Sequence, residues 1–165
     1  MTQLNIEGFQ ETLHEGMCGP ASLKIVLGYF GVHKEERELA ELAGKTDLGT
    51  NDEGLKVAAE SLGFNVVIKN ESSFGDIQEW LDKGVPVIVN WFTRGRSDYS
   101  DSEVADGHYS VATGLDKTNI YLQDPEIGTV RTIRRDDFLK VWFDFLGVLI
   151  KPDELILRQV IAIYR

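Results

Sequence analysis

The 165-residue chain carries 17 Lys and Arg against 27 Asp and Glu, a formal net charge of −10, and 42% of its residues are hydrophobic. A chain of this length and composition can bury a core without disulfides or a structural metal, which excludes a disordered protein and a disulfide-stapled scaffold. No apolar run approaches the roughly 18 residues that span a bilayer. The net charge opposes contact with a phosphate backbone, and the N-terminus lacks a secretion signal. The sequence therefore predicts one cytoplasmic domain over residues 1–165, without nucleic-acid binding or membrane insertion.

The first third of the chain is predicted to be helical. Pro20, in Cys18-Gly19-Pro20, suits a first helical position, and apolar residues recur from there at helical spacing up to Phe30. A short charged helix is expected at about Lys34–Ala43. A capping-box pattern at Thr50–Glu53 predicts a third helix, which ends before Gly63. Cys18 is thereby placed at the N-terminal end of a buried helix.

The rest of the chain is predicted to be mostly strands. Apolar runs bounded by Gly, Pro and Asn turns indicate a series of them. They are expected at residues 64–68, 85–92, 108–114, 119–124, 129–133 and 155–164. Short helices are expected after Ser73 and around Phe138–Phe145. Helices followed by strands predict an α+β fold, with the N-terminal helices packed on an antiparallel sheet.

Cys18 is the only cysteine, so it forms no disulfide within the chain and, alone, no zinc site. It is either a small buried hydrophobic residue or a reactive thiol. A helix N-terminus stabilises a thiolate through its unpaired N–H groups and its dipole. Gly19 leaves space beside the sulfur for a substrate. These features favour a nucleophile.

A thiolate nucleophile needs a general base, and histidine has the appropriate pKa. His33 lies among charged residues and is expected to be solvated. His14, four residues before Cys18, is expected to contact substrate or oxyanion. His108 follows Asp106-Gly107 at the start of a strand, so we predict it to be the base.

A third group should orient the imidazole by accepting its Nδ1 proton. Asp124 ends the strand that follows the His108 strand. An antiparallel hairpin with its turn at Asp116–Asn119 brings these two strands side by side, so Asp124 is predicted to lie near His108. The alternative is that Asp124, which precedes Pro125, only starts a turn.

Several motifs in this order resemble the peptidase C39-like family of the papain-like cysteine peptidase superfamily. They are Met17-Cys-Gly-Pro-Ala-Ser-Leu23, Gly49-Thr50, Leu62-Gly-Phe64, Gly84-Val-Pro-Val-Ile-Val89, Gly107-His-Tyr-Ser-Val111, Gly114-Leu-Asp116, Asp124-Pro-Glu-Ile-Gly128 and Phe138–Trp142. The resemblance covers about residues 9–147. It implies a papain-like fold with Cys18 as nucleophile, His108 as general base and acid, and Asp124 as the orienting group. In the family, the reaction is removal of leader peptides after a double glycine.

The chain departs from the family pattern in the segment before Cys18. The family usually has a glutamine six residues before the cysteine, where it donates to the oxyanion, and this chain has Thr12 there. Gln10 lies eight residues before Cys18, and a two-residue insertion would let its amide reach the site. Gln10 and Thr12 are therefore the candidate oxyanion donors.

The remaining candidate residues concern the substrate cleft and metal binding. His14, Gly19, Trp91 and Gly107 are expected to line the cleft. The acidic loop Asp98–Asp106 lacks the spacing of a calcium-binding loop, so no metal and no cofactor are expected. The loop is expected to form a rim beside His108.

The sequence leaves three functions open. The first is a cysteine peptidase that hydrolyses a peptide bond through a thioester. The second is a peptidyl or acyl transferase that passes the same intermediate to an amine. The third is a peptide-binding module without catalysis, which the threonine at position 12 would favour. All three have a peptide or protein as partner, and the sequence does not indicate the oligomeric state.

Overall fold

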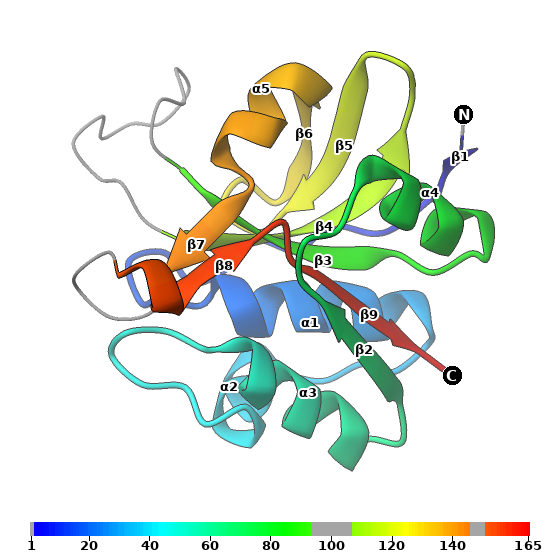
Figure 1. Ribbon diagram of the computed structural model, residues 1–165. Coiled ribbons are helices and arrows are strands. Elements are labelled where there is room, and N and C mark those ends of the chain that lie inside the picture. Colours follow the sequence, from blue (N-terminus) through cyan, green and yellow to red (C-terminus); the bar gives the residue numbers. More distant parts are fainter. Residues whose placement is uncertain (1, 94–106, 146–150) are drawn as a thin grey trace.

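A computed structural model describes residues 2–93, 107–145 and 151–165 of the chain (Figure 1). Its main sheet has the strand order β2-β9-β3-β4-β5-β6, and a further short strand, β1, pairs with β4. All of these pairings are antiparallel. The strands are β1 (Thr2–Gln3), β2 (Asn65–Lys69), β3 (Val87–Phe92), β4 (Gly107–Leu115), β5 (Asn119–Asp124), β6 (Thr129–Arg134) and β9 (Val160–Tyr164).

Helices cover both faces of the sheet. One face carries α1 (Cys18–Tyr29), α2 (Glu36–Leu42) and α3 (Asp52–Ser61), and the other carries α4 (Phe74–Asp82) and α5 (Arg135–Val141) (Figure 1). Because side chains alternate along a strand, each strand contributes to both cores. Ile88 and Val111 pack with α1–α3, whereas Val87, Val89 and Ala112 pack with α4 and α5.

Local sequence signals set the helix starts. Ser73 caps α4 in a complete capping box with Asp76. At α3 the expected cap is displaced by one residue, because the Asn51 side chain, and not that of Thr50, accepts a hydrogen bond from the backbone N–H of Gly54. The α1 helix begins at Cys18 itself, two residues before Pro20. The thiol therefore lies in the first turn of a helix whose next residues are buried.

The expected strand at residues 155–164 is two strands. A turn with Arg158 at φ 46° separates β8 (Leu155–Leu157) from β9. The β9 strand enters the main sheet between β2 and β3, and β8 pairs with β7 (Phe143–Phe145) in a separate small sheet. The expected helix around residues 138–145 was thus wrong in its second half, where the chain forms β7.

These elements confirm the predicted α+β fold with helices packed on an antiparallel sheet. Within the described parts of the chain, no helix combines the length and apolar character needed to cross a membrane.

Candidate active site

Three predicted residues meet where α1 approaches the ends of β4 and β5. His108 is the second residue of β4 and lies opposite Trp91 of β3. Gln123 of β5 pairs with Val111 of β4, so the next residue, Asp124, lies diagonally across from His108. His108 Nε2 is 2.6 Å from Asp124 Oδ1, and Cys18 lies close enough to the same imidazole to contribute to its raised pKa. The fold therefore brings thiol, imidazole and carboxylate together.

The histidine uses its ring nitrogens in the reverse of the expected way. Asp124 was predicted to accept the Nδ1 proton, but its carboxylate contacts Nε2. Nδ1 is therefore the ring nitrogen available to Cys18. The sequence predicts that β4 and β5 are adjacent. It does not fix the rotation of the His108 side chain, which decides which ring nitrogen faces Asp124.

Burial and charge oppose each other at His108. Desolvation of the buried ring lowers its pKa, but the Asp124 charge, its hydrogen bond and the interaction with Cys18 raise the pKa well above the ordinary value. A protonated imidazole beside the thiol stabilises the thiolate. The site is therefore suited to hold a thiolate and an imidazolium together.

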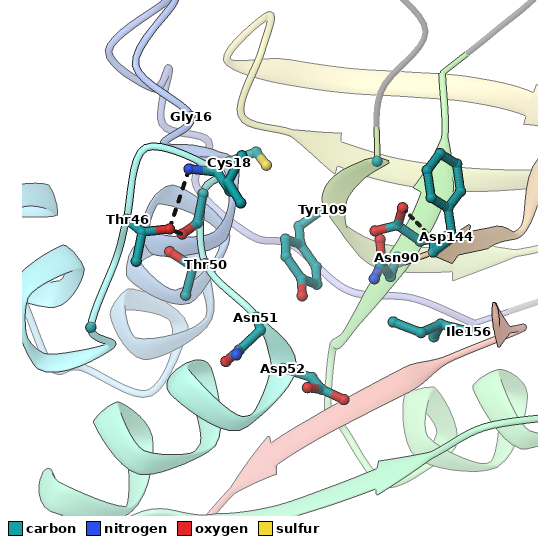
Figure 2. Close-up of a pocket in the computed structure, with 15 residues that line it drawn as sticks. Gly16, Cys18, Thr46, Thr50, Asn51, Asp52, Asn90, Tyr109, Asp144 and Ile156 are labelled. Carbon is teal, nitrogen blue, oxygen red and sulfur yellow. Dashed lines mark hydrogen bonds between the residues drawn. The ribbon is translucent and has the colours of Figure 1, made fainter. Parts of the chain in front are cut away.

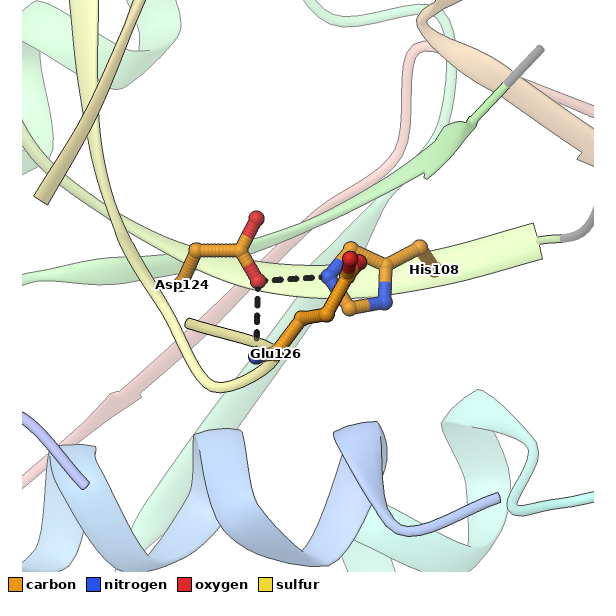
Figure 3. A group of neighbouring side chains, drawn as sticks. All are labelled: His108, Asp124 and Glu126. Atoms are coloured by element: carbon orange, nitrogen blue, oxygen red, sulfur yellow. Dashed lines mark hydrogen bonds and ion pairs between the residues drawn. The ribbon is translucent and has the colours of Figure 1, made fainter. Parts of the chain in front are cut away.

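Asp124 is held on both sides of its carboxylate. Its side chain is fully buried, Oδ2 accepts from Arg131 Nε at 2.8 Å, and Oδ1 also accepts from the Glu126 backbone N–H at 3.0 Å. Figure 3 shows the Glu126 side chain beside the His108 ring. One possible metal-ligand atom from each of His108, Asp124 and Glu126 lies within 4.8 Å of the others. The hydrogen bonds of Asp124 Oδ1 with the His108 ring and the Glu126 backbone N–H bring these three residues together.

The two candidate oxyanion donors are engaged elsewhere. Gln10 Nε2 donates to the Glu126 carbonyl oxygen at 3.1 Å. The Thr12 hydroxyl donates to Glu36 Oε1 at 2.7 Å, and its backbone N–H donates to Glu36 Oε2. The Thr12 hydroxyl proton is therefore already used, which argues against the oxyanion role expected for it.

Glu11, which lies between these two residues, was not predicted from the sequence to belong to the site. Its backbone N–H donates to the Pro125 carbonyl at 2.8 Å, beside Asp124. Burial raises the Glu11 pKa to about 7, partly offset by His108 and reinforced by the charges of Asp124, Glu126 and Glu36. Its position seven residues before Cys18, between the two polar residues that were considered, was the signal available in the sequence.

The Glu11→Gln variant is expected to be more stable than the wild type at pH 8, by about 1–2 kcal/mol after allowance for solvent screening of the partly exposed carboxyl. The folded protein holds the Glu11 proton more tightly than the unfolded chain does. The wild type therefore loses stability as the pH rises from 4.5 through about 7, and the neutral amide does not. Urea unfolding of both proteins at pH 4 and pH 8 measures this.

Glu7→Gln is the control for loss of a carboxylate, because Glu7 is exposed in the same segment. An advantage of Glu11→Gln that is equal at both pH values would contradict the assigned titration.

A cavity of about 380 Å³ adjoins Cys18 (Figure 2). Gly107 lines it as predicted, and a Cβ at residue 107 would overlap the Asp144 carboxylate. Gly16, Thr46 and Thr50 line the side next to Cys18, and Asn90, Asp144 and Ile156 line the opposite side (Figure 2). Asp52 and Tyr109 also line the cavity. The acidic loop 98–106 lies outside the described residues.

Three other cleft expectations need correction. Trp91 is fully buried and packs edge-on against His108 with ring centroids 5.7 Å apart, so it supports the histidine and does not line this cavity. Gly19 faces Thr50 and Tyr109, so the space beside it is filled by the protein itself. His14 is exposed, at φ 64°, on the loop before α1 and does not line this cavity either. Sequence spacing alone could not distinguish these packing roles from substrate contacts.

The fold and this site define a papain-like α+β protein with a thiol, an imidazole and a carboxylate at one place. The chain belongs to the Peptidase C39 family, whose sequence profile matches residues 9–154. An uncharacterized protein of Methanothermobacter marburgensis is 38% identical over 128 residues, which cover 76% of this chain and 75% of that protein.

Solved structures support the fold assignment. The peptidase domain of Streptococcus ComA, a bi-functional ABC transporter involved in quorum sensing, superposes with a TM-score of 0.70 at 22% identity, covering 95% of this chain and 97% of that domain. A double glycine motif protease from an AMS/PCAT transporter, in complex with its leader peptide, gives a TM-score of 0.68 at 18% identity, covering 99% and 94%.

Proposed function

We propose that this protein is a cysteine peptidase in which Cys18, His108 and Asp124 form the catalytic triad. The observation that carries the proposal is the placement of His108 between a buried carboxylate and the thiol at the start of α1. Membership of the Peptidase C39 family supports it.

The proposed reaction has two steps. The Cys18 thiolate attacks the peptide carbonyl carbon, the C–N bond breaks, and the departing amine takes a proton from His108. Water then attacks the thioester, giving one proton back to His108, and the acid product leaves Cys18 as the thiolate. The first N–H groups of α1, including that of Cys18, lie where a helix leaves donors unpaired and can stabilise the oxyanion.

Cleavage after small residues such as Gly-Gly belongs to the same proposal. Its support is the similarity to a double glycine motif protease that was solved with its leader peptide. Transfer to an amine would proceed through the same thioester, and product analysis separates the two reactions because only a transferase yields a ligated peptide.

The alkylation rate of Cys18 against pH tests the proposal first. Because Cys18 is the only cysteine, intact-mass spectrometry reports its modification directly. We expect the wild type to react with iodoacetamide at neutral pH much faster than His108→Ala does, since the imidazolium that stabilises the thiolate is absent from the variant.

The matched control is His33→Ala, which removes an exposed histidine outside the site and should behave like the wild type. If Cys18 reacts at the same rate with and without His108, the catalytic proposal is wrong and the peptide-binding module becomes the better explanation.

A further inference from the structure

The cavity beside Cys18 has a buried polar side chain in its wall that lacks a protein partner. Asn90 is 1% exposed, and neither its Nδ2 nor its Oδ1 has a hydrogen-bond partner among the residues that the structure describes. The Thr50 hydroxyl, on the opposite side of the cavity, is also buried without a partner. Buried polar atoms are nearly always paired, so an unpaired amide in a cavity wall indicates that a ligand supplies the missing bonds.

The charges around this cavity are negative. Asp52 and Asp144 both line it (Figure 2). Asp52 accepts a hydrogen bond from the neutral Gln159 side chain and so keeps its negative charge, and none of the described lining residues is Lys or Arg. Tyr109 lies within electrostatic range of both carboxylates, since burial, Cys18, Asp52 and Asp144 together raise the Tyr109 pKa well above its ordinary value. The hydroxyl is therefore neutral and able to form hydrogen bonds. The described part of the cavity favours a positive charge.

Three apolar side chains also line the cavity. Leu48, Phe145 and Ile156 line the same cavity, and Leu48 is 87% exposed. An exposed leucine beside a polar, acidic pocket offers a surface for a hydrocarbon chain. Lys and Arg combine an aliphatic stem with a charged end and can contact both kinds of surface at once.

We propose that this cavity is a specificity pocket for a basic side chain of the peptide substrate. The aliphatic stem packs on Leu48 and Ile156, and the cationic group reaches Asp52 and the Asn90 amide oxygen. This inference rests on the proposed function, since it assigns the pocket to a peptide held at Cys18. It adds a substrate class, peptides with Lys or Arg close to the cleaved bond, to the general expectation of a peptide.

Equilibrium binding to the Cys18→Ala protein tests the pocket without requiring catalysis. The probes are fluorescein-labelled alanine peptides ending in Gly-Gly, in which Lys, norleucine or Glu is moved through each preceding position. At one position, Lys is expected to bind about tenfold to a hundredfold more tightly than norleucine, the range for a hydrogen bond to a charged group. Glu should bind more weakly than norleucine there.

Two variants in the Cys18→Ala background locate the preference. Asp52→Asn should lose most of the Lys advantage and leave norleucine binding unchanged. Asp47→Asn is the matched control, because Asp47 is exposed on the same loop and does not line the cavity. Asn90→Leu removes an amide that has no partner in the fold, so it should remain folded and should also weaken the Lys preference.

A Lys preference that survives both Asp52→Asn and Asn90→Leu would overturn the inference, as would its absence at every position. A triad that does not function is recognised in a different experiment, the alkylation of Cys18. There, Cys18 would react at the same rate with and without His108. A selective pocket with an inert thiol would therefore retain this inference and reject the proposed catalysis.

Discussion

The His108→Ala variant is expected to cleave peptides at least about 10⁴-fold more slowly than the wild type, the range found when one member of a catalytic triad is removed. His108 is the residue proposed both to deprotonate the thiol and to protonate the departing amine, so its removal abolishes both steps. The measurement is kcat/KM on a peptide that the wild-type protein cleaves, followed by mass spectrometry of the products.

His33→Ala again provides the control and should stay within about twofold of the wild type, since surface changes rarely alter catalysis. Circular dichroism of His108→Ala would show that the sheet remains formed. Retention of more than about a hundredth of the wild-type kcat/KM in a folded His108→Ala protein would contradict its role as base.

Replacement of Asp124 by Asn is expected to lower the free energy of unfolding by about 3–5 kcal/mol, the cost of breaking a buried ion pair on one side. Asp124 is fully buried, and Arg131, whose side chain is 6% exposed, loses the carboxylate that lies 2.8 Å from its Nε. The Glu126 carboxylate, 4.0 Å from Arg131 Nη2, is too distant to replace this contact fully. Urea unfolding at pH 7 gives the difference.

The double variant Asp124→Asn/Arg131→Gln separates the loss of the ion pair with Arg131 from the loss of the hydrogen bonds of Asp124. It should lose at least about 1 kcal/mol less than the sum of the two single changes. Glu79→Gln breaks an exposed pair with Lys83 and should cost less than about 1 kcal/mol. A loss for Asp124→Asn that is no larger than for Glu79→Gln would mean that the buried pair contributes little to stability.

The helices and most strands could be predicted because their signals are local. Ser73 and the apolar spacing after Cys18 act within a few residues, and the structure places α4 and α1 there. The division of residues 155–164 had no such signal. Its cause is tertiary, since β9 enters the main sheet and β8 pairs with β7.

In the candidate site, too, some features could be predicted from local sequence and others depend on tertiary packing. The approach of His108 to Asp124 follows from hairpin register, which the turn at residues 116–119 indicates. The ring nitrogen that faces Asp124, the burial of Trp91 and the environment of Glu11 depend on packing between distant segments. Glu11 lies beside Pro125, more than a hundred residues away in the chain, and no local pattern records that contact.

The position of β9 also determines when the candidate active site can form during synthesis of the chain. Because β9 lies between β2 and β3, the β2 strand has no place in the main sheet until residues 160–164 are available. Ile161 and Ile163 of β9 belong to the core on which α1 packs. A growing chain therefore contains Cys18, His108 and Asp124 well before it can bury the helix that carries the thiol. Reactivity of that thiol should therefore develop late, once β9 has left the ribosome.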